Sequence, residues 1–351
     1  MRLARTILGL MLVLGCNGRS RDLSPITIEP FAVMGDESGD GAMATWPRVS
    51  ARHPLGFRIL VPQPSGVPTL PLVYDDSGKF VGTLGSLGDG ASDFVDPLFA
   101  RLGPGDSIWI FDGSRRAQVF SPERQHVRTV PLPVAPWDAV VLRGGRIALT
   151  PALFGQPLPF LVLDVDGLII RRIGVNDSTS PTPRRIIAGT DGTVWLLSMT
   201  HRFNLQQWDL YGNKLKEFDT APQWFEPYDD MQAPDVASDR APQAAVQDGW
   251  VDTDGRIWIV GKVADPNWRD GLGAAVDGSA PITDADKVYD TVVEVRDGET
   301  GRVIAQSRFD GTYPLSAEPG VITRVRTTSS GWHRAELARI LVDARRLSRS
   351  Q

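Results

Sequence analysis

Three regularities of the sequence predict an all-β fold. Short apolar runs rich in Val, Ile and Trp recur along the chain, and most are followed by a polar turn containing Asp or Gly. The 35 glycines and 27 prolines interrupt the chain throughout, which favours many short strands over long helices. The strand pairs recur about every 45 residues, the size of a unit that must pack against copies of itself to bury both faces. These observations together predict a β-propeller.

The repeating unit is a β-hairpin with a tight polar turn, as in PLVYDDSGKFVGTLG at 71–85 and FLVLDVDGLIIRRIG at 160–174. The turns open at corresponding positions, and only the last gap is about twice as long as the others. These positions are Asp75, Ser121, Asp164, Asp209 and Asp297. A shorter strand precedes most hairpins, and we expect its tryptophan, Trp109, Trp195 or Trp258, to pack between neighbouring units.

Counting units gives six blades of four antiparallel strands over residues 25–345. Five lie at about 46–84, 94–132, 137–174, 184–219 and 247–310. The sixth combines 320–328 and 333–343 with PITIEPFAVMG (25–35) from the N-terminal end as its outer strand. Pairing of the N- and C-terminal strands would close the ring and remove exposed sheet edges. The alternative is a double-sheet sandwich, in which so even a period is unusual.

The stretch 82–122, GTLGSLGDGASDFVDPLFARLGPGDSIWIFDGSRRAQVFSP, resembles the repeat of six-bladed propellers of the NHL-like (TolB-like) type. Its Gly-rich segment ends in Phe94 and Pro97 and leads into an inner strand, after which IWIFD and RRAQVF follow. The resemblance extends over nearly the whole chain beyond its N-terminal segment, but the fifth unit departs from it. It implies the fold and says little about chemistry.

The N-terminal segment has the layout of an export signal. Arg2 and Arg5 precede the apolar run TILGLMLVLG, which is too short to span a bilayer as a helix. Its end, VLGC, resembles the lipobox of bacterial lipoproteins, which implies cleavage before Cys16, the only cysteine, and lipidation of that residue. Residues 1–15 would then be a lipoprotein signal peptide and 16–24 a lipidated N-terminus with a short linker. The alternative is an ordinary signal peptide in which Cys16 has no such role.

This layout predicts an exported protein, held on a bacterial membrane through lipidated Cys16, with the propeller in the periplasm or at the cell surface. Asn17 favours the outer membrane by resemblance to enterobacterial sorting. The net charge of −5 becomes −7 once Arg2 and Arg5 are removed. Because no long basic tract remains, nucleic acid is not an expected partner.

Two long irregular segments, at about 220–248 and 261–290, flank the strand GRIWIV (255–260) and are predicted to be insertions rather than a further blade. In an up-and-down blade, the loop that enters it and its second internal loop lie on the same face of the ring. Both insertions should therefore cover one face, and long loops of this kind often carry function. Their aromatic and charged residues are the predicted binding residues: Trp224, Phe225, Tyr228, Asp229, Asp230, Trp268, Arg269 and Asp270. Alternatively, the aromatic residues fix the loops to the ring and the charged residues are simply solvated.

The sequence predicts neither a metal nor a cofactor. The fragments DDSG (75–78), DVDG (164–167) and DTDG (252–255) lack the distal Glu of a calcium loop and are better explained as turns. A looser cage of Asp229, Asp230, Asp284 and Asp286 remains possible. The four histidines are scattered, and neither HExxH nor GxSxG occurs, so a zinc centre or a serine nucleophile is not indicated.

We therefore expect a membrane-anchored cell-envelope lipoprotein whose propeller binds a protein, peptide or glycan without catalysis. The alternative is a propeller enzyme of lactonase or lyase type with a metal in its central channel. That function would require several inward-facing carboxylates, which the recognisable blades do not show. A solute-binding sensor is a third possibility, for which the sequence gives no separate sign.

Overall fold

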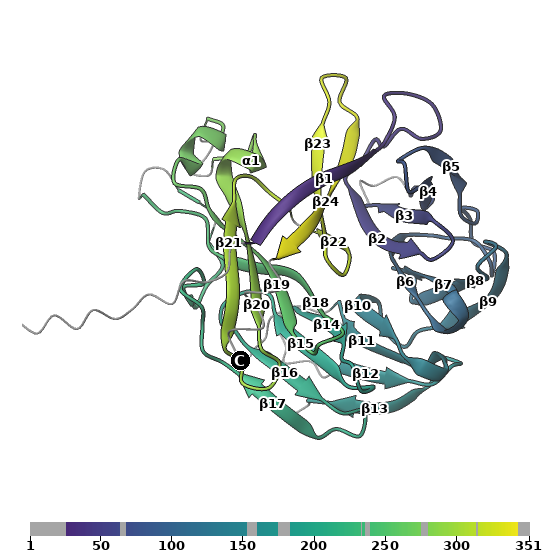
Figure 1. Cartoon of the computed structure of the whole chain (residues 1–351). Helices are drawn as coiled ribbons and strands as arrows, with labels where there is room; N and C mark the ends of the chain where they lie inside the picture. The colour runs from purple at the N-terminus through teal and green to yellow at the C-terminus, as the bar shows by residue number, and fades with distance from the viewer. Residues whose placement is uncertain are drawn as a thin grey trace, which may run out of the picture.

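The computed structural model describes residues 26–63, 68–152, 160–174, 183–232, 234–235, 239–274, 280–313 and 315–342. These residues form six sheets, each of four antiparallel strands, arranged around a central axis (Figure 1). The predicted six-bladed β-propeller is therefore confirmed. The predicted signal peptide, Cys16 and the linker lie outside the described residues. Within the described ranges, no helix has the length and apolar character needed to cross a membrane.

Five blades are continuous in sequence, and their strands run from the axis outward in chain order. The first two blades contain β2 (Pro47–His53), β3 (Phe57–Pro62), β4 (Leu72–Asp75), β5 (Phe80–Thr83), β6 (Pro97–Leu102), β7 (Ile108–Asp112), β8 (Arg116–Phe120) and β9 (His126–Pro131). The third and fourth contain β10 (Pro136–Val141), β11 (Ile147–Pro151), β12 (Phe160–Leu163), β13 (Ile169–Ile173), β14 (Arg184–Ala188), β15 (Val194–Ser198), β16 (Leu205–Trp208) and β17 (Lys214–Phe218). The fifth contains β18 (Ala245–Val251), β19 (Ile257–Ala264), β20 (Tyr289–Arg296) and β21 (Val303–Phe309).

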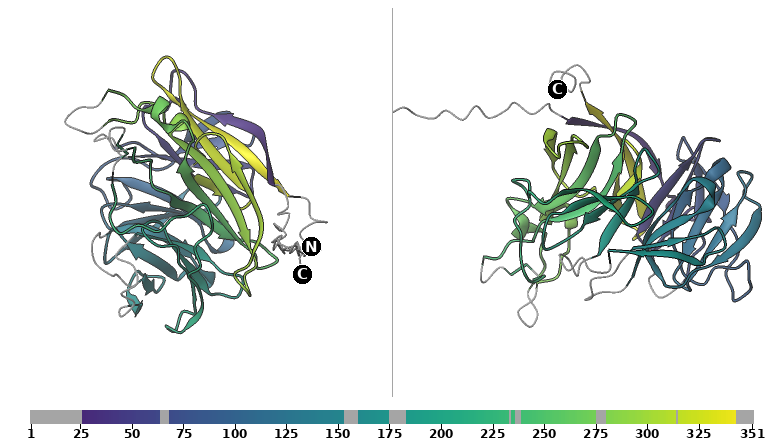
Figure 2. Two further views of the ribbon diagram at one scale, coloured as in Figure 1. Left: turned by 90° about the vertical axis from the view of Figure 1, so that its left-hand side faces the viewer. Right: turned by 90° about the horizontal axis from the view of Figure 1, so that it is seen from below.

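The sixth blade is built from both ends of the described chain. Its order is β22 (Leu315–Glu318), β23 (Val321–Thr327), β24 (His333–Val342) and then β1 (Ile26–Met34) at the outside. The purple β1 lies along the yellow β24 in Figure 1 and again in Figure 2. The register runs from Ile26 opposite Val342 to Met34 opposite Ala335. Closure by the N-terminal strand is confirmed, whereas the innermost strand β22 was not recognised in the sequence.

Apolar side chains of adjacent blades form the core. One cluster joins the fifth blade to the sixth and includes Trp258, whose side chain packs with Ile322 and Ala338. Trp109 and Trp195 occupy the equivalent strand in their own blades, and 2% and 3% of their surface remains exposed. The recurring tryptophans therefore pack between blades, as predicted.

The Asp-Gly motifs are turns, as the sequence indicated. The carboxylate of Asp75 accepts hydrogen bonds from the backbone N–H groups of Ser77 and Lys79 at 2.9 and 3.0 Å. Gly78 has φ +89°, a conformation that a side chain would strain. Asp164 and Asp252 make equivalent pairs of backbone hydrogen bonds.

Two long connections interrupt the regular blades on one face of the ring, which we call the insertion face. The first runs from 219 to 244, between β17 and β18, and the second runs from 265 to 288, between β19 and β20. The second contains η3 (Trp268–Gly271) and α1 (Ala285–Val288). An ion pair between Arg269 and Asp239 joins the two connections. Both therefore lie on the same side of the propeller.

We predict that the seam between the sixth and first blades is sensitive to lost volume. Leu337 of β24 is fully buried against a cluster that includes Met34, Leu60 and Tyr74. Leu337→Ala should lower the free energy of unfolding by about 2–5 kcal/mol, measured by urea denaturation. Leu341→Ala on the same strand is the matched control, since Leu341 is 46% exposed and its truncation should cost about 0.5 kcal/mol or less. Equal losses in both variants would contradict this account of the seam.

Candidate binding site

A cavity of about 560 Å³ opens on the insertion face, and we call it the insertion-face pocket. Its walls combine the ends of blade strands with both sides of the first insertion, and most of the lining side chains are apolar or aromatic. They are Trp137, Pro183, Met199, Thr200, His201, Tyr228, Met231, Gln232, Pro234, Pro242, Gln243, Ala245, Gln247, Lys262 and Tyr289. A volume of this size and an apolar lining with a few polar groups are typical of a site for an organic ligand.

Lys262 supplies the positive charge of the pocket. It lies on β19, and its Nζ atom is 4.4 Å from the centre of the Tyr289 ring on the neighbouring β20. Burial lowers the pKa of Lys262. Among the described residues, no carboxylate forms an ion pair with this ammonium group. A ligand carboxylate or other anion would therefore gain a charged partner in an apolar environment.

The opposite wall joins the fourth blade to the first insertion. The Tyr228 ring lies 5.2 Å from the His201 ring, and its backbone N–H donates to the His201 carbonyl at 2.9 Å. The Tyr228 hydroxyl donates to the Ala244 carbonyl at 3.3 Å. Trp137 of the third blade directs its Nε1 towards the Met199 sulfur at 3.3 Å. These contacts fix three aromatic rings around the cavity without help from a ligand.

A buried charge cluster lies on the innermost strands, which surround the central channel. Asp138, with 1% of its surface exposed, lies 2.5 Å from Arg101 and 3.7 Å from both Arg48 and Arg185. The four residues come from the innermost strands of the first four blades. Burial opposes ionisation of Asp138, but the charges of Arg101, Arg185 and Arg48 outweigh it and hold its pKa below the ordinary value. Burial, reinforced by Arg185, lowers the pKa of Arg48 to about 9.

This cluster bears on the alternative of a metal in the channel. A divalent cation there would meet three guanidinium groups around one carboxylate, whose charge they already neutralise. Elsewhere on the innermost strands, Asp248 and Glu318 line a further hollow together with Arg52 and Arg101. A second hollow, of about 400 Å³, is lined by Arg48 and Arg185 and shares Trp137 with the insertion-face pocket.

Several of the residues predicted for binding serve to hold the insertions in place. Phe225 and Trp268 are buried, with 2% and 4% of their surface exposed. Trp224 is partly buried, and its Nε1 donates to Glu294 at 2.9 Å. Arg269 lies over the Trp268 ring, 4.6 Å from its centre, and pairs with Asp239. For these four residues, the alternative of loop packing fits the geometry better than ligand contact.

The remaining predicted residues are divided between surfaces. Tyr228 lines the insertion-face pocket. Asp229 and Asp230 are exposed beside it, whereas Asp270 lines a separate acidic hollow. The cage of Asp229, Asp230, Asp284 and Asp286 is not formed within the described chain, because Asp286 is paired with Arg324.

The structure adds pocket residues that the sequence did not single out, above all Trp137, Met199, His201 and Lys262. Most sit at strand ends or in short loops of blades far apart in the sequence. One feature of the sequence could have indicated Lys262: it is the only charged residue within the apolar strand IWIVGKVA. A lysine in that position is unusual for a buried strand and marks a candidate site.

The fold defines the class of the protein as a six-bladed β-propeller with an apolar, cationic pocket on its loop-rich face. No protein family model matches the sequence, and no curated protein does so either. A crystal structure of a DUF4221 family member from Bacteroides vulgatus is similar, with a TM-score of 0.62 and 9% sequence identity over 92% of this chain and 100% of that one.

A Bacteroides fragilis protein that is inferred to be exported is also similar, with a TM-score of 0.57 and 9% identity over 92% of this chain and 97% of that one. A gluconolactonase from Xanthomonas campestris reaches a TM-score of 0.47 and 13% identity, over 92% of this chain and 99% of that one. The first two likenesses support the fold, and the third is too distant to bear on activity.

We predict that Asp138 stabilises the folded protein strongly by neutralising the charges of the arginines around it. Asp138→Asn should lower the free energy of unfolding at pH 7 by about 3–5 kcal/mol, because it removes the carboxylate that the three arginines surround. The pKa of Asp138 is depressed in the folded state, so its contribution is present above the unfolded value of about 3.9 and is lost as the pH falls through the folded value. The difference between wild type and variant, measured by urea denaturation, should therefore shrink below pH of about 4.

Asp166→Asn provides the control for this experiment. Its carboxylate is 75% exposed and lies 3.7 Å from Arg128. We expect a change of about 0.5 kcal/mol or less. A pH-independent loss in Asp138→Asn would show that the side chain stabilises the channel by shape rather than by charge.

Proposed function

We propose that this protein is an exported, lipid-anchored propeller of the NHL-like type that binds a peptide segment of another envelope protein without catalysis. The observation that carries the proposal is the insertion-face pocket, whose apolar and aromatic walls surround the ammonium group of Lys262, which has no carboxylate partner among the described residues. The ligand that fits this chemistry has an apolar side chain for the cavity and a carboxylate for the lysine.

A peptide suits these walls better than a glycan. Three prolines, Pro183, Pro234 and Pro242, contribute to the lining and offer no backbone N–H group to sugar hydroxyls. The rings of Trp137 and Tyr228 provide flat apolar surface for side chains of the ligand. The second hollow, which leads to Arg48 and Arg185, offers a place for a further acidic group.

The topology also supports an orientation relative to the membrane. Ile26, where the described chain begins, pairs with Val342 at the end of β24, so β1 starts at the face opposite the insertions and runs towards them. A linker of the length of residues 17–25 spans at most about 30 Å. An anchor at Cys16 would hold that opposite face near the membrane, and the pocket would open away from it.

A photocrosslinker in the pocket tests the function. p-Benzoylphenylalanine at Met231, a rim residue that is 67% exposed, should form an adduct in intact cells. The same group at Leu168, which is 66% exposed in a turn of the third blade, is the control and should not form that adduct. Protease digestion should reduce the adduct to a peptide. An adduct that resists protease and contains sugar would contradict the peptide proposal.

The role of the lysine is tested in the same cells. Lys262→Met should reduce the adduct at position 231 about tenfold, which corresponds to the loss of one charge-assisted contact. Lys214→Met is matched to it, since Lys214 also lies over an aromatic ring, 5.8 Å from the centre of Trp208, but on an outer strand. An equal effect of both variants would overturn the assignment of the pocket.

The anchor is tested by Cys16→Ser. We expect the variant to appear in the soluble fraction, while wild type sediments with membranes, because the variant can carry no acyl chain on a thiol. Cell fractionation with immunodetection measures the distribution. Membrane association of the variant at the wild-type level would refute lipid anchoring through this residue.

A further inference from the structure

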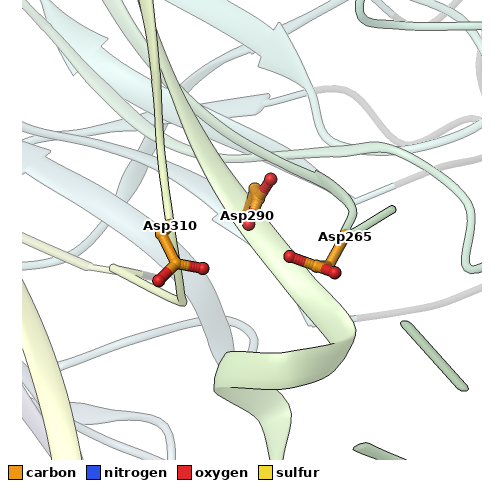
Figure 3. Close-up of side chains that lie close together, drawn as sticks. All are labelled: Asp265, Asp290 and Asp310. Carbon is orange, nitrogen blue, oxygen red and sulfur yellow. The ribbon is translucent and has the colours of Figure 1, made fainter. Parts of the chain in front are cut away.

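Three carboxylates converge at the edge of the fifth blade on the insertion face. Asp265, Asp290 and Asp310 each place a carboxylate oxygen so that all three atoms lie within 4.8 Å of one another. Figure 3 shows the three side chains directed towards a common point, with Asp290 between the other two. Among the described residues, this is the one such group of acidic, histidine or cysteine side chains.

The strand register explains why residues so distant in sequence meet. Val263 lies opposite Asp290, and Phe309 lies opposite Thr291. Asp310 therefore follows β21 at the position beside Asp290, and Asp265 follows β19 on the same side as Val263. Three adjacent strand ends thus present one carboxylate each.

Asp290 provides a second observation, independent of the clustering. Its side chain is 92% buried, since 8% of its surface is exposed. One oxygen, Oδ2, accepts a hydrogen bond from Arg308 at 2.5 Å. The other, Oδ1, is buried and accepts no hydrogen bond from an N–H or O–H group of the described residues, and the neighbouring group is the carboxylate of Asp265. A buried carboxylate oxygen without a partner costs free energy, so it points to a ligand that the protein chain itself does not supply.

The three carboxylates carry more negative charge than the neighbouring arginine compensates. Arg308 compensates one of the three negative charges, which leaves a balance of two. A divalent cation would neutralise the remaining charge and give the orphaned oxygen a partner.

We infer that Asp265, Asp290 and Asp310 form a binding site for a divalent cation, with Ca²⁺ as the best fit. All donors are oxygens, which hard cations prefer, and no thiolate or imidazole belongs to the group. A polar hollow of about 430 Å³ adjoins Asp265 and Asp310 and leaves space for water to complete the coordination shell. The cation would join β19, β20 and β21 at the point where the second insertion leaves and re-enters the blade.

Calorimetry on the full-length protein in detergent tests this inference. After dialysis against EGTA, titration with CaCl₂ should show one site with a dissociation constant on the order of 10⁻⁴ to 10⁻³ M, as in other extracellular modules. Scanning calorimetry with excess CaCl₂ should raise Tm by about 1–3 °C. Asp265→Asn and Asp310→Asn, whose side chains lie at strand ends, should each weaken binding at least about tenfold.

Asp290→Asn distinguishes a ligand from a structural carboxylate. If Asp290 binds the cation, the variant should lose the calcium-dependent rise in Tm while its Tm in EGTA stays near that of wild type, because charge repulsion is relieved. If its role is only to pair with Arg308, Tm should fall in EGTA and the calcium response should persist. Asp166→Asn, an exposed turn carboxylate, is the control and should bind calcium like wild type.

Each of Ca²⁺, Mg²⁺ and Mn²⁺ is tested at a concentration tenfold above the highest expected dissociation constant. If none of them gives binding heat or a shift in Tm, the inference is wrong. Retention of wild-type affinity in all three Asp→Asn variants of the triad would overturn it as well. Neither result depends on the peptide pocket, so this site and the proposed function can fail separately.

Discussion

The pairing of β1 with β24 is the constraint on which the rest of the molecule depends. A propeller blade buries its two faces only against its neighbours, so an open ring would expose the apolar faces of two blades. Here the first strand of the described chain becomes the outermost strand of the last blade, and Met34 and Leu337 fill the seam beside Leu60 and Tyr74. The closed ring then fixes the strand ends that form the pocket and the carboxylate group.

Electrostatics divides the ring into two different environments. On the innermost strands, Arg48, Arg101 and Arg185 surround Asp138, so arginines outnumber carboxylates within this cluster. The edge of the fifth blade holds three carboxylates with one arginine, and this balance favours a cation. Because of this separation, the proposed cation and the proposed acidic ligand would bind to different groups on the same face of the protein.

The sequence was informative wherever a local pattern repeats. The hairpin turns at Asp75 and Asp164 and the tryptophan strands follow from short-range geometry, so the blade count and the closure of the ring could be predicted. The candidate site could not be predicted, because the sequences around Trp137, His201 and Lys262 form no binding motif. The three residues meet only through the packing of the blades. The same packing explains why aromatic residues of the insertions, such as Trp268, turned out to be buried rather than available to a ligand.

The insertion-face pocket and the carboxylate group both include residues of β20 and lie beside the end of β19. Tyr289, next to Lys262, lines the pocket, and the following residue, Asp290, belongs to the carboxylate group. Because successive side chains of a strand point to opposite faces, one segment of backbone positions both. A cation that fixes the ends of β19 and β20 would therefore also restrict the backbone that carries Lys262 and Tyr289.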